Sequence, residues 1–196
     1  MKSEIYKNQR GSIGAFVLDF IQSIVLALAV FVLLYLFVAQ PNEVKGSSML
    51  PNFVDKEFLL TEKISYYLGD PQRGDVVIFK APATEPCAAE ECEYIKRIIG
   101  IPGDSVMVKE NQVYLNGKLL NQIFLPSDVI TIEGQYSQEG IETIVPKDEY
   151  LCFGDNRQHS RDGREFGPIK KELIVGKAFF KYWPVPSIGL VPTVRF

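Results

Sequence analysis

The pattern of apolar and polar residues changes once along the chain, near position 40. From Ala15 to Ala39 the residues are apolar apart from Asp19, Gln22 and Ser23, which lie near the start of the stretch. A helix of about 20 residues is long enough to span the hydrocarbon core of a bilayer. This pattern therefore predicts a single N-terminal transmembrane helix over residues 15–39.

A cleaved secretion signal is the main alternative for this stretch. Such a signal has an apolar run of roughly 7 to 15 residues, followed by small residues around the cleavage site. Here the apolar run is longer, and Phe37 stands where a cut after Ala39 would require a small residue. We therefore expect the helix to remain as a membrane anchor.

The charges on either side of the helix predict its orientation. Lys2, Lys7 and Arg10 precede it, whereas the first stretch after it, residues 40–45, carries no net charge. By the positive-inside rule, the N-terminus lies in the cytoplasm and the rest of the chain outside the membrane. The expected order is a cytoplasmic N-terminus (1–14), a single-pass helix (15–39) in the lipid bilayer of the cytoplasmic membrane, and an extracytoplasmic domain (40–196).

Beyond the anchor the helical periodicity disappears, and short β-branched runs alternate with Gly, Pro, Asn and Asp. This pattern predicts a mostly antiparallel β domain. Asn116-Gly117 is a good two-residue hairpin turn, because both residue types tolerate positive φ. The tract 125–147 is polar, with weak strand signals at 130–132 and 142–145. The expected strands are 58–64, 75–80, 94–99, 105–108, 112–115, 118–120, 149–153 and 174–183.

Length and charge narrow the class of protein. A chain of 196 residues has room for one ordinary domain besides the anchor. The net charge is −3 and the charges are scattered among apolar residues, with no basic stripe that could neutralise phosphates. We therefore expect no nucleic-acid partner.

The cysteines suggest little chemistry of their own. Cys87 and Cys92 lie close together in a Pro- and Glu-rich loop and could form a local disulfide in an oxidising compartment, or stay reduced. With one histidine and no second cysteine pair, no zinc or other metal is expected. Cys152 lies in an apolar run, where a lone cysteine is usually a buried small hydrophobe.

Three polar stretches could carry a reaction. The first is Gly46-Ser47-Ser48, a small turn with hydroxyl groups soon after the predicted membrane exit. A nucleophile needs such exposure, but the same residues are common in plain linkers and turns.

The second stretch contains Lys96, in the expected strand 94–99. Strand alternation places it between Tyr94 and Ile98 on a face that should be buried. Burial would lower the pKa of the lysine, and a neutral lysine can accept a proton from a serine hydroxyl. Alternatively, Lys96 or Arg97 is an edge-strand charge that discourages aggregation.

The third stretch, residues 154–164, is a dense alternation of acids, bases and amides directly after an apolar strand. It could be a solvated loop with Asx turns and exchangeable ion pairs. It could also supply a hydroxyl that orients a buried lysine, and an Asp/Arg pair that fixes the loop.

Together these stretches resemble the type I signal peptidase family. Gly46 to Pro51 is similar to its nucleophile box, Gly-x-Ser-Met-x-Pro, and Tyr94 to Asp104 resembles its lysine box. Arg73-Gly74-Asp75 resembles the family's Arg-Gly-Asp strand, and Gly154 to Arg164 its Gly-Asp-Asn-Arg box. These boxes occur in the family's order.

The resemblance implies a signal-peptidase-like antiparallel β domain that removes signal peptides from secreted precursor proteins by serine endoproteolysis, without a cofactor. In this pattern Ser48 is the nucleophile, Lys96 the general base and Ser160 the group that orients the lysine amine. The resemblance further assigns bracing roles to Asp155, Asp162 and Arg164. It assigns shallow pockets for small substrate residues to Val44, Met49, Phe53 and Ile95.

The chain departs from the family pattern at a few positions. Gly46 offers no hydroxyl where some members have a serine that helps to bind the oxyanion. Asn52 stands where Thr is usual, and Gly163 where Ser is usual. We expect the last two differences to tune loop rigidity at most.

Other functions fit parts of the sequence. A self-cleaving Ser/Lys protease of the repressor type shares the dyad, but it would not need the anchor. An anchored β-rich binding module would not need the Ser-Met-x-Pro turn together with the lysine strand. A thiol enzyme using Cys152 and His159 requires an exposed thiol. A triad of Ser48, His159 and an aspartate is conceivable on composition alone.

Overall fold

A computed structural model describes residues 2–85 and 92–196 of the chain. The chain divides into two compact units, Met1–Ala39 and Gln40–Phe196. The unit 40–196 contains the polar stretches singled out above.

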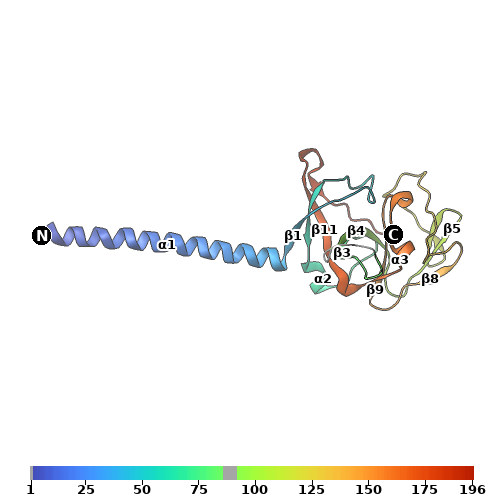
Figure 1. Cartoon of the computed structure of the whole chain (residues 1–196), viewed down its shortest axis with the longest axis horizontal. Coiled ribbons are helices and arrows are strands. Elements are labelled where there is room, and N and C mark those ends of the chain that lie inside the picture. Colours follow the sequence, from blue (N-terminus) through green and yellow to red (C-terminus); the bar gives the residue numbers. More distant parts are fainter. Residues whose placement is uncertain (1, 86–91) are drawn as a thin grey trace. The chain divides into compact units, whose positions relative to one another are not determined.

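The first unit is one long helix, α1 (Lys2–Phe37) (Figure 1). Within it, Ile13–Leu33 is long and apolar enough to cross a membrane. The helix begins well before the predicted residue 15, because Glu, Lys, Gln and Arg in the polar N-terminal segment are good helix formers. It ends two residues before the predicted residue 39, where Ala39 already belongs to a strand.

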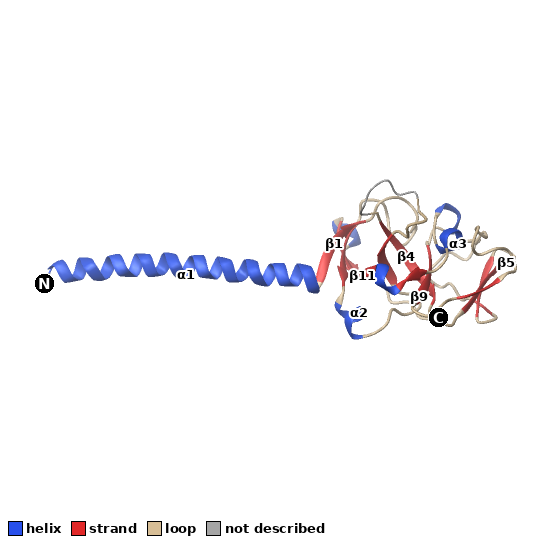
Figure 2. Cartoon of the chain, turned by 60° about the horizontal axis from the view of Figure 1, so that its bottom comes forward, coloured by secondary structure: helices blue, strands red, loops and turns tan. Residues whose placement is uncertain are grey.

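The second unit is built from two antiparallel sheets. The larger sheet has eight strands in the order β1-β2-β11-β3-β4-β9-β10, with β12 paired to β11, and the smaller one has the order β7-β6-β5-β8. Both views place β1 and β5 at opposite ends of this domain (Figures 1 and 2). The expected mostly antiparallel β domain is confirmed. The strands are β1 (Ala39–Glu43), β2 (Phe58–Glu62), β3 (Val76–Lys80), β4 (Glu93–Gly100), β5 (Ser105–Lys109), β6 (Gln112–Leu115), β7 (Lys118–Leu119), β8 (Glu142–Ile144), β9 (Glu149–Phe153), β10 (Ile169–Lys170), β11 (Ile174–Trp183) and β12 (Gly189–Leu190).

Short helical turns connect some of these strands. They are α2 (Ile64–Leu68), α3 (Gly163–Phe166) and the single 3-10 turns η1 (Arg157–His159), η2 (Lys171–Leu173) and η3 (Val185–Ser187). The predicted strand 58–64 therefore ends at Glu62, because the chain turns into α2. The weak signal at 142–145 corresponds to β8, whereas residues 130–132 form no strand.

Three clusters of buried side chains form the core, and β4 contributes to all of them. Ile99 packs in the cluster shared with the smaller sheet, Ile98 packs with β3 and β9, and the half-buried Ile95 packs against the third cluster. In the sheet, β4 lies between β3 and β9. A side chain on β4 is therefore held from both sides.

Candidate active site

Ser48 lies in a tight turn after β1. Gly46 has φ +87°, a conformation that glycine adopts without steric cost. The Gly46 N–H donates to Asp55 Oδ1 at 2.6 Å, and the Leu50 N–H donates to the Ser47 carbonyl at 3.2 Å. Ser47 is exposed and Ser48 is half-buried. The turn thus leaves the Ser47 side chain in solvent and places the Ser48 side chain partly inside the domain.

Lys96 meets Ser48 from the middle of β4. Its Nζ lies 2.7 Å from Ser48 Oγ and 3.0 Å from the carbonyl oxygen of Ile95. The lysine is only 4 % exposed, although strand β4 begins at an exposed residue. Residues 48 positions apart in the sequence are therefore joined by a direct hydrogen bond.

Burial controls the protonation of this lysine. Desolvation lowers the pKa of Lys96 from 10.5 to about 8. The negative charges of Asp162 and Asp155 oppose this shift, and the positive charge of Arg164 adds to it. A useful fraction of the amine is therefore neutral near pH 8, which is the form that can accept a proton.

Two arginine–aspartate pairs brace the loop after β9. Asp155 accepts hydrogen bonds from Arg97 at 2.9 and 2.7 Å, and from the Asn52 amide at 2.8 Å. Asp162 accepts from Arg164 at 2.9 and 2.8 Å, and from the Gly154 N–H at 2.8 Å. These buried, fork-shaped contacts are among the stronger hydrogen bonds in proteins.

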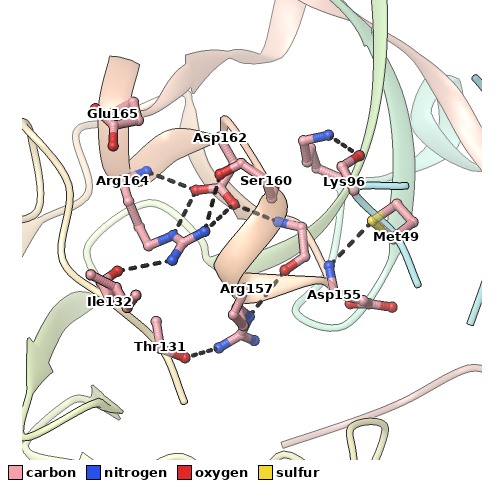
Figure 3. A network of polar contacts seen from close by, with 12 residues as sticks. Met49, Lys96, Thr131, Ile132, Asp155, Arg157, Ser160, Asp162, Arg164 and Glu165 are labelled. Atoms are coloured by element: carbon pink, nitrogen blue, oxygen red, sulfur yellow. Dashed lines mark hydrogen bonds and ion pairs between the residues drawn. The ribbon is translucent and has the colours of Figure 1, made fainter. Parts of the chain in front are cut away.

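A third arginine completes the network behind the site. Arg157 is 2 % exposed and donates to Thr131 Oγ1 at 2.7 Å and to the Gly154 carbonyl at 3.1 Å. Figure 3 shows Arg157 and Arg164 side by side, bound to Thr131 and Asp162. The loop carrying Ser160 is therefore fixed at several backbone and side-chain positions.

Ser160 lies close to the backbone of Ser48 and has no observed hydrogen bond to Ser48 or Lys96. Its hydroxyl is buried and has no hydrogen-bond partner among the residues that the structure describes. A Cβ at Gly154 would collide with the Ser160 side chain and with the Ser48 carbonyl oxygen, so these groups meet at Gly154. The Asn156 N–H also donates to that carbonyl at 3.0 Å.

The residues expected to line substrate pockets lie together. Val44, Met49 and Phe53 belong to one core cluster, in which each is 2 % exposed or less, and Ile95 packs against it. Met49 also touches the loop after β9, since its sulfur accepts from the Asp155 N–H at 3.5 Å. Val44, Met49 and Phe53 are therefore almost completely covered in this structure.

Sequence reasoning missed part of this network. Arg97 belongs to the lysine box and Arg157 to the following box, but the sequence assigned no role in the site to either residue. Asn52, noted only as a departure from the family, binds Asp155 directly. Gly163 was noted in the same way, yet a Cβ there would meet the Cys152 carbonyl at 2.9 Å. The role of these residues depends on contacts that no local pattern encodes.

The alternative nucleophile and base are placed differently. Cys152 is fully buried, and burial raises the pKa of its thiol. The side chain of His159 is exposed at the end of η1. Neither placement suits the thiol enzyme or the histidine triad, because a reactive thiolate and a paired base are both required.

The other two cysteines and the expected absence of a metal site remain to be compared with the structure. Cys92 is disulfide-bonded, whereas Cys87, the partner considered for it in the sequence, lies outside the described residues. Across 2–85 and 92–196, no group of three or more His, Cys, Asp or Glu side chains could hold a metal ion.

The fold and the site define a class before any relative is considered: a β-rich domain in which a buried lysine amine contacts a serine hydroxyl. The family model described as signal peptidase, peptidase S26, matches residues 17–183, and the chain belongs to this family. Its members are serine endopeptidases, and this chain is accordingly a serine peptidase that removes signal peptides.

The chain is also similar to individual signal peptidases. The chain is 39% identical over 155 residues to the probable signal peptidase I-2 of Synechocystis, covering 79% of this chain and 68% of the relative. It is 33% identical over 179 residues to signal peptidase IB of Staphylococcus aureus strain COL, covering 86% and 90%. A crystal structure of a signal peptidase I from Enterococcus faecalis aligns with a TM-score of 0.44 and 26% identity, over 56% of this chain and 97% of that chain.

Proposed function

We propose that the chain cleaves precursors through a Ser48/Lys96 dyad, with Ser48 as nucleophile and Lys96 as its general base. The observation that carries this proposal is the 2.7 Å contact between the buried amine and the hydroxyl. This distance suits proton transfer between the two atoms. The lowered pKa of Lys96 provides the neutral amine that the transfer needs.

The reaction follows from this geometry. Ser48 Oγ attacks the scissile carbonyl while its proton moves to Lys96 Nζ. The resulting ammonium gives that proton to the leaving amine as the peptide bond breaks, and an acyl-enzyme remains on Ser48. Lys96 then deprotonates a water molecule that hydrolyses the ester, and the proton returns to Ser48 Oγ.

The backbone N–H of Ser48 supports the charge that develops on the substrate oxygen. Within the described part of the chain, no acceptor is found for this N–H. One donor aimed at a developing oxyanion contributes roughly 3 kcal/mol of transition-state stabilisation. Because residue 46 is glycine, the chain supplies no side-chain hydroxyl there as a second donor.

The substrate is a precursor with small residues near the cut. Val44, Met49, Phe53 and Ile95 form the apolar surface next to the dyad, and tight packing leaves that surface shallow. A shallow surface accepts small side chains and excludes large ones, because close-packed cores give way at considerable energetic cost. Ser160, Asp155, Asp162 and Arg164 then hold the lysine side of the site.

The chain is anchored in the cytoplasmic membrane by α1, with residues 1–14 in the cytoplasm and residues 40–196 outside. Ile13–Leu33 is the candidate span. The basic residues Lys2, Lys7 and Arg10 all precede it, which favours a cytoplasmic N-terminus. This orientation brings the domain to the side on which exported precursors emerge.

Cleavage of a secretory precursor by adjacent serine variants tests the dyad. Purified full-length protein in detergent is incubated with a precursor, and the cut is mapped by mass spectrometry. Ser48→Ala should abolish cleavage, whereas Ser47→Ala, the matched control one residue away, should stay active. An active Ser48→Ala variant would refute the proposed nucleophile.

A further inference from the structure

A second polar cluster surrounds the hydroxyl of Tyr94, whose ring faces the lysine amine. Glu85 Oε2 accepts a hydrogen bond from Tyr94 Oη at 3.0 Å and one from Arg161 Nε at 2.8 Å. The Glu85 side chain is fully buried, whereas that of Arg161 is 55% exposed. One carboxylate oxygen therefore joins two segments that are distant in sequence.

The first of these segments is the start of β4. Tyr94 lies two residues before Lys96, and the centre of its ring is 5.3 Å from the lysine Nζ. Phe79 contacts the ring edge-on at 6.0 Å, and Phe166 stacks on it at 6.2 Å. The Tyr94 ring is thus a packed wall of the lysine pocket, and Glu85 holds its hydroxyl end.

The second segment is the loop between η1 and α3. Arg161 stands between Ser160 and Asp162, whose charge acts on Lys96. Glu85 restrains this loop by accepting a hydrogen bond from the half-exposed Arg161. The buried pair of Arg164 and Asp162 restrains the same loop on the protein interior side. The Glu85 carboxylate therefore connects the Tyr94 ring with the loop that carries Arg161, and both lie near the Lys96 amine.

The contact brings little net stability. A hydrogen bond to a charged group stabilises the fold, but a buried polar atom without a partner costs a comparable amount of free energy. Glu85 Oε1 is such an atom, since it has no hydrogen-bond partner in the described structure. The main consequence of the carboxylate is therefore the position that it imposes on Tyr94 and Arg161.

We propose that Glu85 is a positioning residue for the general base, which keeps water away from the Lys96 amine by holding Tyr94 and Arg161 in place. This inference rests on the proposed dyad. It extends the site to a residue in a loop that the family resemblance covers poorly.

The direction of the expected effect separates positioning from simple electrostatics. The charged or titratable groups that act on the Lys96 amine are Asp162, Asp155, Arg164 and Cys152. Those that act on the Tyr94 hydroxyl are Glu85 and Arg161. Removing a negative charge would lower the pKa of a nearby lysine. Admitting water to the amine would raise it instead, because desolvation is the largest cause of its low value.

The test is the acid limb of kcat/KM against pH, measured with the full-length protein and a precursor peptide. Glu85→Ala should move the limb to higher pH by about one unit, a tenfold loss of kcat/KM at any pH well below it. Tyr94→Phe and Arg161→Ala should move it less, in the same direction. Glu85→Gln retains one acceptor oxygen for Tyr94 and Arg161 and should stay close to the wild type.

Asp70→Asn serves as the control, because it breaks an exposed 2.6 Å ion pair with Lys171. It should leave the limb in place. The inference is overturned if the limb stays fixed or moves to lower pH in Glu85→Ala, Tyr94→Phe and Arg161→Ala, or if Asp70→Asn moves it equally. Tyr94→Phe removes only the hydroxyl that binds Glu85 and changes no charge, so this variant tests the idea even where Glu85→Ala does not fold.

Failure of this inference can be distinguished from failure of the dyad. If Lys96→Ala cleaves normally, the dyad is wrong and no limb can be assigned to the lysine. If Lys96→Ala is inactive and the limb does not respond to Glu85, Tyr94 or Arg161, only the positioning role is wrong.

Discussion

Lys96 has two carboxylates nearby, yet its amine remains easy to deprotonate. Asp155 is already bound by Arg97, and Asp162 by Arg164. Because these arginines compensate the negative charges, desolvation determines the pKa of Lys96, which falls to about 8. An uncompensated aspartate at the same place would stabilise the ammonium and remove the base.

The pH dependence of cleavage follows from this value. Since only the neutral amine accepts the Ser48 proton, kcat/KM should fall about tenfold per pH unit well below pH 8. The unfolded chain, with a lysine pKa near 10.5, binds more protons between about pH 8 and 10.5, so Lys96 makes folding more favourable as pH rises through this window. A pH–rate profile checks the first statement, and a flat profile down to pH 6 would contradict it.

At the scale of elements, short β-branched runs separated by Gly, Pro, Asn and Asp predicted most of the strands. The ranges expected for β6, β9 and β11 match the observed bounds. Very short strands such as β10 and β12, with two residues each, carry no detectable period. They form because a partner strand is already in place, which is tertiary information.

The same limit applies to the site. Ser48, Lys96 and the polar loop stand out through residue type and family pattern. The pair of Arg97 and Asp155 joins residues 58 positions apart, and Asn52 reaches Asp155 across 103 positions. Glu85 contacts Arg161 across 76 positions. Such contacts depend on how β4 and β9 are paired in the sheet, so the sequence alone could not predict them.

Gly154 follows β9 and packs against the turn that carries Ser48. Its N–H binds Asp162, and a Cβ there would collide with the Ser160 side chain and the Ser48 carbonyl. We expect Gly154→Ala to lose most cleavage activity and about 1–3 kcal/mol of stability, because overpacking displaces the turn. Cleavage assays and thermal unfolding measure the two effects.

Gly189 provides the matched control for this substitution. A Cβ there meets no atom within 4 Å, so Gly189→Ala should retain activity and stability. Equal activity of Gly154→Ala and Gly189→Ala would show that the close approach at Gly154 does not hold the site together.

At the scale of the whole molecule, an apolar helix precedes a domain that carries all the proposed reacting groups. The helix has a candidate span at Ile13–Leu33, and the domain 40–196 has its own core. Such a division suits an enzyme whose substrates also carry an apolar segment, because membrane attachment raises the local concentration of both partners.

The proposed orientation can be tested on intact cells. A protease added from outside to spheroplasts should digest the domain beyond Pro41 and leave a tag on Met1–Arg10 intact, because the basic residues precede the helix. Immunoblots against each end report the result. Protection of the large domain would refute the orientation.

The identity of the base is the central claim, and the comparison of Lys96→Ala with His159→Ala tests it most directly. Both variants are assayed as full-length protein on one precursor, with circular dichroism to confirm folding. Because Lys96 contacts Ser48 while the side chain of His159 is exposed, Lys96→Ala should lose at least about 1,000-fold in kcat/KM. His159→Ala should keep most of the activity. An inactive His159→Ala together with a folded, active Lys96→Ala would contradict the lysine base and favour a histidine triad.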